Sequence, residues 1–141
     1  PNYVRRKAIS AADAIALIHD IGGVAAWSHP AVHFRDESGE LDSEALEQFL
    51  RELLDLGLDG IEVFSASHAE DDTECLEVLA SKYGVLRVAG SDFHEKNNYP
   101  PDALGLHSAT APGDYQTYGF STDDVVPRLD EAIGKRKNIP R

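Results

Sequence analysis

The sequence predicts an α/β fold in which helices alternate with parallel strands. Three amphipathic segments, each closed by glycine, alternate with three short apolar segments that show no helical period. Strands joined through helices pair in parallel, because each helix returns the chain to the same end of the sheet. The chain has 141 residues, of which 42% are hydrophobic and 27% charged, which is ordinary for one globular domain. We therefore predict a single domain over residues 1–141.

The first predicted helix begins near Ser10, which forms a variant of the capping box with Asp13. Isoleucines lie near one face of this helix: Ile15, Ile18 and Ile21. The pair Gly22-Gly23 ends it. The apolar run 24–28 has no helical period and leads into His29-Pro30, where the proline disfavours a helical His29. This run is interpreted as a buried strand followed by a loop.

The second predicted helix has the strongest helical pattern in the chain. Its apolar stripe consists of Leu46, Phe49, Leu50, Leu53 and Leu54. The stripe repeats every 3.6 residues, and Gly57 closes it. A second buried strand follows over residues 60–64.

The third predicted helix ends at Gly84 and is followed by a strand over residues 85–89. One face of this helix carries Leu76, Leu79 and Tyr83. Residues 90–120 are rich in proline and glycine and are long for a connection, which favours a functional loop region. A last helix is predicted over residues 121–134, with its regular part starting near Pro127, because proline is tolerated in a first turn.

Composition excludes several classes of function. Thirteen Lys and Arg against 25 Asp and Glu give a net charge of −12, which disfavours binding to nucleic acid or membranes through long-range charge. The single Cys75 cannot form an internal disulfide, and the sequence has neither a long apolar run nor a signal segment. We therefore expect a cytoplasmic protein. Because the chain opens at Pro1 and has no methionine, we expect a piece of a longer gene product, with residues 1–9 ending a preceding segment.

Each of the three predicted strands leads into a histidine. The first ends at His29, the second is followed by His68, and the third by Asp92 and His94. Ligands of parallel α/β sheets bind at the carboxyl ends of the strands. Asp92 and His94 point to the same side of an extended segment, and a carboxylate with imidazoles suits Zn, Mn or Fe better than Ca. The sequence therefore predicts a metal-binding site at this edge.

Each of these residues also has a purely structural interpretation. Asp92 can cap a turn beside a half-exposed His94, His29 can bond a carbonyl, and His68 can cap the following helix. The functional interpretation depends on the convergence of all three strand ends on one edge.

Other polar residues carry weaker signals. The remaining histidines are interpreted as solvated or locally bonded, or lie in the long loop: His19, His33 and His107. Glu62 lies in the second strand and is either an inner support for a site or a member of a structural ion pair. Cys75 is interpreted as a small core residue, and Trp27 as sheet core.

Several motifs, taken in order, closely resemble the C-terminal half of the PHP (polymerase and histidinol phosphatase) superfamily over about residues 2–110. They are Asn2-Tyr3-Val4, Ala14-Ile15, Gly22-Gly23-Val24-Ala25, His29-Pro30, Leu56-Gly57-Leu58-Asp59-Gly60-Ile61-Glu62-Val63, Ser67-His68 and Gly90-Ser91-Asp92-Phe93-His94. The branch resembled most is that of small metal-dependent phosphoesterases that act on nucleotides.

The resemblance implies a distorted seven-stranded β/α barrel with a di- or trinuclear metal site at the strand carboxyl ends. By position, His29, Asp92 and His94 match metal ligands, with Asp92 and His94 also catalytic. His68 matches a residue near the substrate phosphate or behind the metal ligands. The implied cofactors are divalent Mn, Zn or Fe, with Mg as a further option, and the implied substrate is a phosphomonoester or nucleotide phosphate.

The chain departs from the family in one large respect. The early ligands of the family, including a His-x-His pair, have no counterpart in residues 1–141. We therefore expect the isolated chain to be inactive and to associate with the N-terminal half or with a second copy, because half a barrel leaves unpaired sheet edges. Two alternatives stay open: a non-catalytic half barrel that binds a metal or a partner, and a PHP module of a DNA polymerase.

Overall fold

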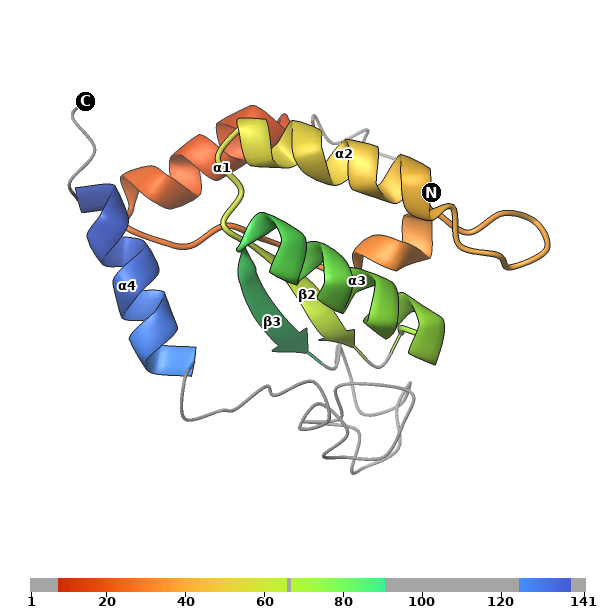
Figure 1. The fold of residues 1–141 in the computed structure, drawn as a ribbon. Coiled ribbons are helices and arrows are strands. Elements are labelled where there is room, and N and C mark those ends of the chain that lie inside the picture. The colour runs from red at the N-terminus through yellow and green to blue at the C-terminus, as the bar shows by residue number, and fades with distance from the viewer. Residues whose placement is uncertain (1–7, 66, 91–124, 138–141) are drawn as a thin grey trace, which may run out of the picture.

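The structure is a computed structural model that describes residues 8–65, 67–90 and 125–137. Its elements are α1 (Ala11–Asp20), β1 (Ala26–Trp27), the 3₁₀ helix η1 (Pro30–His33), α2 (Ser43–Asp55), β2 (Gly60–Ser65), α3 (Glu70–Tyr83), β3 (Leu86–Gly90) and α4 (Val125–Lys137). The strands form one sheet in the order β1-β2-β3, and both pairings are parallel. The predicted alternation of helices with parallel strands is therefore confirmed (Figure 1).

Helix α1 begins at the predicted cap. The Ser10 hydroxyl oxygen accepts the backbone N–H of Asp13 at 3.1 Å, and the hydroxyl also bonds the Asp13 carboxylate at 2.7 Å. Ile15 is buried, as predicted, but Ile21 is 78% exposed. Ile21 lies at the C-cap, where the chain turns through Gly22 at a φ of +80°, so the apolar face ends one turn earlier than the sequence suggests.

Helix α2 follows its predicted stripe. Asp42 caps it by accepting the backbone N–H of Ala45 at 2.9 Å. Leu46, Leu50 and Leu53 are buried in the core. Phe49 is 41% exposed, because its ring belongs to a separate aromatic cluster near the edge of the sheet.

That aromatic cluster consists of Trp27, Phe34 and Phe49. The Trp27 ring lies 5.9 Å from that of Phe34 and 5.3 Å from that of Phe49, both in edge-on arrangements, and the two phenylalanine rings are 5.9 Å apart. Trp27 is only partly buried. The expectation that Trp27 lies in the sheet core is therefore wrong in detail, since it packs beside the core.

Strand β1 is shorter than the predicted run 24–28. The backbone N–H of Ala25 bonds the Asp59 carboxylate at 2.7 Å instead of entering the ladder. At the other end, His29 adopts a left-handed backbone conformation. Only two residues between these points remain in register with β2. The predicted loop after His29-Pro30 contains the short helix η1.

Strand β2 is the centre of the described sheet, and all six of its residues are buried. Helix α3 crosses from β2 to β3 and ends at Gly84, which has a φ of +64°. The parallel register of β2 and β3 shifts between Glu62 and Phe64, which marks a β-bulge. The core consists of Ile15, Ala25, Ala31, Leu46, Leu50, Leu53, Leu58, Ile61, Val63, Phe64, Leu76, Leu79 and Ala80.

Helix α4 runs to Lys137, three residues beyond the predicted end, and Pro127 lies in its first turn. Residues 121–124 of the predicted segment and the loop from 91 onwards lie outside the described residues. Within the described ranges, no helix combines the length and the apolar character needed to cross a membrane.

Candidate functional site

The candidate site lies at the carboxyl ends of β1 and β2. His29 is two residues beyond the end of β1, and His68 is three residues beyond the end of β2. The arrows of β2 and β3 in Figure 1 point to the same edge of the sheet. Asp92 and His94 follow β3 in the sequence but lie outside the described residues, as does His107. The structure thus places two of the four predicted site residues at the predicted edge.

His29 has an unusual backbone conformation. Its φ of 33° and ψ of 58° make it the one non-glycine residue with positive φ among those described. A positive φ is uncommon for any residue other than glycine, although Asn, Asp and His adopt it more often than the rest, and residues in such conformations cluster at functional sites. The His29 ring nitrogen Nδ1 is buried and has no hydrogen-bond partner within the described part of the chain.

His68 is held in one tautomer by its surroundings. The residue is 1% exposed, and its Nδ1 lies 3.0 Å from the backbone carbonyl oxygen of Val63. Because a carbonyl can only accept, Nδ1 carries a proton, and in the neutral ring the lone pair is then on Nε2. Nε2 is buried, and nothing in the described ranges bonds it. An imidazole fixed in this way is a typical metal ligand or proton acceptor.

The turn that carries His68 is stabilised by hydrogen bonds and a buried carboxylate. The Ser65 and Ser67 hydroxyls are 3.0 Å apart, and the His68 N–H bonds the Ser65 carbonyl at 3.1 Å. The turn enters α3, where Asp72 accepts the N–H of Ala69 at 2.8 Å. The proposal that His68 caps the helix is wrong, because Asp72 performs that role.

Asp72 also joins this turn to the segment after η1. It is 1% exposed, and its second carboxylate oxygen lies 2.6 Å from a guanidinium nitrogen of Arg35. Asp71 is 3.1 Å from the same nitrogen, and the bond from Asp72 raises the pKa of Arg35. Local sequence patterns do not predict this pair, because Arg35 and Asp72 are 37 positions apart and only the Asp at the third position of the helix is a local signal.

Glu62 lies in the middle of β2 and is 8% exposed. Its carboxylate oxygen Oε2 accepts the backbone N–H of His29 at 2.6 Å. Among the described ion pairs, none involves Glu62. Of the two interpretations of Glu62, support of the site therefore fits better than a structural ion pair.

The other described histidines are placed differently. His33 ends η1, is exposed, and has its ring 6.0 Å from that of His29. His19 lies on α1, where Nε2 is 3.0 Å from the Asp59 carboxylate at the amino end of β2. The described residues contain no group of three or more His, Cys, Asp or Glu side chains able to hold a metal ion. The predicted ligands Asp92 and His94 lie outside these residues.

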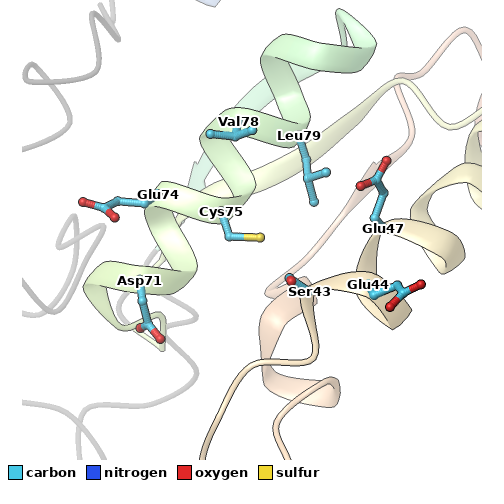
Figure 2. Close-up of a pocket in the computed structure, with 8 residues that line it drawn as sticks. All are labelled: Ser43, Glu44, Glu47, Asp71, Glu74, Cys75, Val78 and Leu79. Carbon is cyan, nitrogen blue, oxygen red and sulfur yellow. The ribbon is translucent and has the colours of Figure 1, made fainter.

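A groove of about 550 Å³ lies apart from these histidines, between α2 and α3 (Figure 2). It is lined by Ser43, Glu44, Glu47, Asp71, Glu74, Cys75, Val78 and Leu79. Burial, followed by the charges of Asp72, Glu47 and Asp71, raises the pKa of the Cys75 thiol. The thiol therefore stays protonated at neutral pH, which agrees with a packing role and argues against a nucleophile.

No family model matches the sequence. The chain is 32% identical over 94 residues to a 3′,5′-nucleoside bisphosphate phosphatase of Chromobacterium violaceum, a match covering 67% of this chain and 31% of the relative. It is 37% identical over 89 residues to a phosphoribosyl 1,2-cyclic phosphate 1,2-diphosphodiesterase of Eggerthella lenta. This match covers 62% of this chain and 29% of the relative. The chain therefore spans about a third of the length of the curated relatives it matches.

Two solved structures have a similar fold. One, from Bifidobacterium adolescentis, is described as a metal-dependent phosphoesterase and matches at a TM-score of 0.64 and 25% identity, over 92% of this chain and 39% of that one. The other is described as an amidohydrolase from Chromobacterium violaceum with bound sulfate. It matches at a TM-score of 0.57 and 28% identity, over 84% of this chain and 39% of that one. The chain is thus similar in sequence and fold to part of several proteins that are named as phosphoesterases.

Proposed function

We propose that this chain supplies part of the active site of a metal-dependent phosphoesterase of the PHP type. The observation that carries the proposal is the pair His29 and His68. Both lie at the carboxyl ends of adjacent parallel strands, and each has a buried ring nitrogen that nothing in the described residues bonds. Buried polar atoms in proteins are almost always satisfied, so two such nitrogens at one sheet edge point to a ligand.

The proposed substrate is a phosphomonoester or nucleotide phosphate, which is hydrolysed to inorganic phosphate and an alcohol. The names of two relatives, a bisphosphate phosphatase and a cyclic phosphate diphosphodiesterase, support this class. The similar Chromobacterium structure binds sulfate, a tetrahedral dianion like phosphate. We propose that the complete fold is the distorted seven-stranded barrel, of which three parallel strands lie in the described residues.

The proposed roles rest on the family resemblance, and donor chemistry supports them. His29, Asp92 and His94 would hold divalent Mn, Zn, Fe or Mg, and Asp92 and His94 would also take part in catalysis. The chemistry supplied by bound divalent metal ions is the activation of water and the neutralisation of phosphoryl oxygens. His68, with its proton on Nδ1, accepts a hydrogen bond through Nε2 from water or a protonated phosphoryl oxygen. It donates a bond to the phosphate only when Nε2 is protonated as well.

We further propose that residues outside this chain complete the site. The matches cover 31% and 29% of the curated relatives, so the remaining strands and ligands of a similar protein lie elsewhere. The partner would be an N-terminal half of the barrel or a second copy of the chain. Light scattering across a range of concentrations tests the second copy, which predicts a dimer.

The decisive experiment measures phosphate release from a nucleoside monophosphate in the presence of Mn²⁺. The chain, its Asp92→Asn variant and a His33→Ala control are compared, and the bound metal of Asp92→Ala and His33→Ala is measured in parallel. We expect Asp92→Ala to lose most of the bound metal, whereas His33→Ala changes little.

Three outcomes are distinct. Activity that Asp92→Asn abolishes would mean that these residues complete a working centre without another half. Metal binding without activity would restrict the phosphoesterase proposal to the longer protein and favour a non-catalytic half barrel for this chain. Equal metal content in Asp92→Ala and His33→Ala would contradict the site assignment.

A further inference from the structure

Glu62, on the central strand β2, contacts the chain on both of its flanking sides, at the end of β1 and at the end of β3. On the β1 side, its Oε2 accepts the backbone N–H of His29 at 2.6 Å. On the β3 side, its Oε1 fills the space that a Cβ on Gly90 would need. The carboxylate of Glu62 therefore touches the backbone of His29 and the last residue of β3, Gly90.

The conformation of His29 needs a restraint. A left-handed backbone is unfavourable for a residue with a Cβ, and Pro30 further limits the choices of the residue before it. A short hydrogen bond to a carboxylate is about twice as strong as one between neutral groups. The bond from Glu62 joins the His29 backbone directly, so it can hold the conformation that sets the direction of the imidazole.

Gly90 is needed at its position for space. It is not among the glycines with positive φ, so its backbone suits any residue. An added Cβ would nevertheless overlap Glu62 Oε1, while the next nearest atom, the Glu62 carboxyl carbon, would lie at an ordinary 3.5 Å. The β-bulge just after Glu62 changes the local register of β2 against β3 and brings Ser65 opposite Gly90.

A purely stabilising role does not account for Glu62. Removing a carboxylate from water is costly, and the described residues give it no Lys or Arg partner. An apolar side chain would be the better choice for stability in a strand whose other residues are all buried.

We propose that Glu62 is a positioning residue for the site, and that Gly90 provides the space in which its carboxylate lies. Glu62 holds His29 in the left-handed conformation and thereby aims the imidazole at the carboxyl edge of the sheet. This inference rests on the proposed function in that His29 is the metal ligand being aimed.

The experiment is a double-mutant cycle on the full chain with Glu62→Ala, Gly90→Ala and the double variant. Glu62→Gln is the conservative variant, because its amide oxygen still accepts the His29 N–H. Gly134→Ala is the matched glycine control, since its added methyl meets nothing within 4 Å. Glu74→Ala removes an exposed glutamate as the second control. Each variant is measured for Zn²⁺ affinity, for the His29 imidazole NMR resonances and for stability in urea.

We expect Glu62→Ala to weaken Zn²⁺ binding about 10–100-fold, as is typical when a group that orients a ligand is lost, and to shift the His29 ring resonances. Glu62→Gln should recover most of the affinity. Gly90→Ala should reproduce the loss by displacing the carboxylate, and it should add little in the Glu62→Ala background, where nothing is left to displace. Both controls should match the parent chain in Zn²⁺ affinity and in the His29 ring resonances.

The outcomes separate this proposal from the proposed function. Unchanged Zn²⁺ affinity and ring resonances in Glu62→Ala, with only stability lowered, would overturn the positioning role. Additive losses for Glu62→Ala and Gly90→Ala would overturn the shared mechanism. If the parent chain binds no Zn²⁺, its own proposed ligands do not hold a metal without the residues proposed to complete the site. The positioning role is then supported if Glu62→Ala and Gly90→Ala move the His29 ring resonances and overturned if they do not.

Discussion

Histidines lie at both ends of the described sheet, but the hydrogen bonding of their ring nitrogens differs. At the amino end, Asp59 bonds His19 at 3.0 Å and the backbone N–H of Ala25 at 2.7 Å, and this histidine and carboxylate hold α1 against β1 and β2. At the carboxyl end, His29 and His68 each keep a buried ring nitrogen without a partner in the described residues. A His–Asp pair that is satisfied in this way stabilises the fold, whereas buried nitrogens without a partner among the described residues are the basis of the proposed ligand site.

The largest expected effect is on metal affinity, which should fall for a variant at the carboxyl end of the sheet and stay the same for one at the amino end. Loss of a group that orients a metal ligand typically weakens binding about 10–100-fold. His29→Ala should weaken Zn²⁺ or Mn²⁺ binding by more than this, because it removes a proposed ligand itself. His19→Ala should leave the affinity unchanged. Isothermal titration calorimetry of both variants measures the difference in affinity. Equal affinities would contradict the proposal that His29, unlike His19, binds the metal.

The next effect tests whether stability is independent of the site. Leu50 is 1% exposed in the core stripe of α2. Leu50→Ala should lower the free energy of unfolding by about 2–5 kcal/mol, because it removes buried methyl groups and leaves a cavity. Urea denaturation measures this cost, with the partly exposed Phe49→Ala as a milder comparison. A neutral Leu50→Ala would show that this face is not packed.

A smaller effect tests the amino end directly. His19→Ala should cost about 1 kcal/mol of unfolding free energy, since it removes one hydrogen bond to a half-buried carboxylate that keeps its bond to Ala25. Urea denaturation at neutral pH measures it, and Asp13→Ala on the exposed cap of the same helix is the reference. A cost above that of Leu50→Ala would mean that the pair has a role beyond stability.

The smallest effect concerns Cys75, away from both ends. Because burial and nearby carboxylates raise its pKa above the ordinary value of a thiol, the folded thiol should react with iodoacetamide more slowly at pH 8 than the urea-unfolded thiol. The rate should rise with pH, since the thiolate is the reactive form. Mass spectrometry of timed samples measures it. Equal rates in the folded and unfolded chains would contradict the packing role of Cys75.

Local patterns were sufficient to predict most of the fold. The helices, their glycine stops and the parallel order all follow from apolar spacing, as the buried Leu46, Leu50 and Leu53 illustrate. Strand β1 was predicted too long, because the bond from Ala25 to the Asp59 carboxylate involves a residue 34 positions away. Contacts at that separation leave no local signal.

The same limit applies to the candidate site. The sequence placed His29 and His68 at the strand ends, because a residue after a buried run lies at a sheet edge. It could not distinguish the roles of Glu62, because the partner of this carboxylate is a backbone N–H on another strand. Asp92 and His94 stay predictions, since they lie outside the described residues.

The aromatic cluster near β1 has a practical consequence. Trp27 is the only tryptophan of the chain, and it lies two residues before His29 with its ring packed edge-on against Phe34 and Phe49. Indole emission depends on the packing and polarity around the ring, so the native fluorescence of this protein reports on the segment that carries His29. The chain therefore contains its own optical probe for movements of that segment, and no dye needs to be attached.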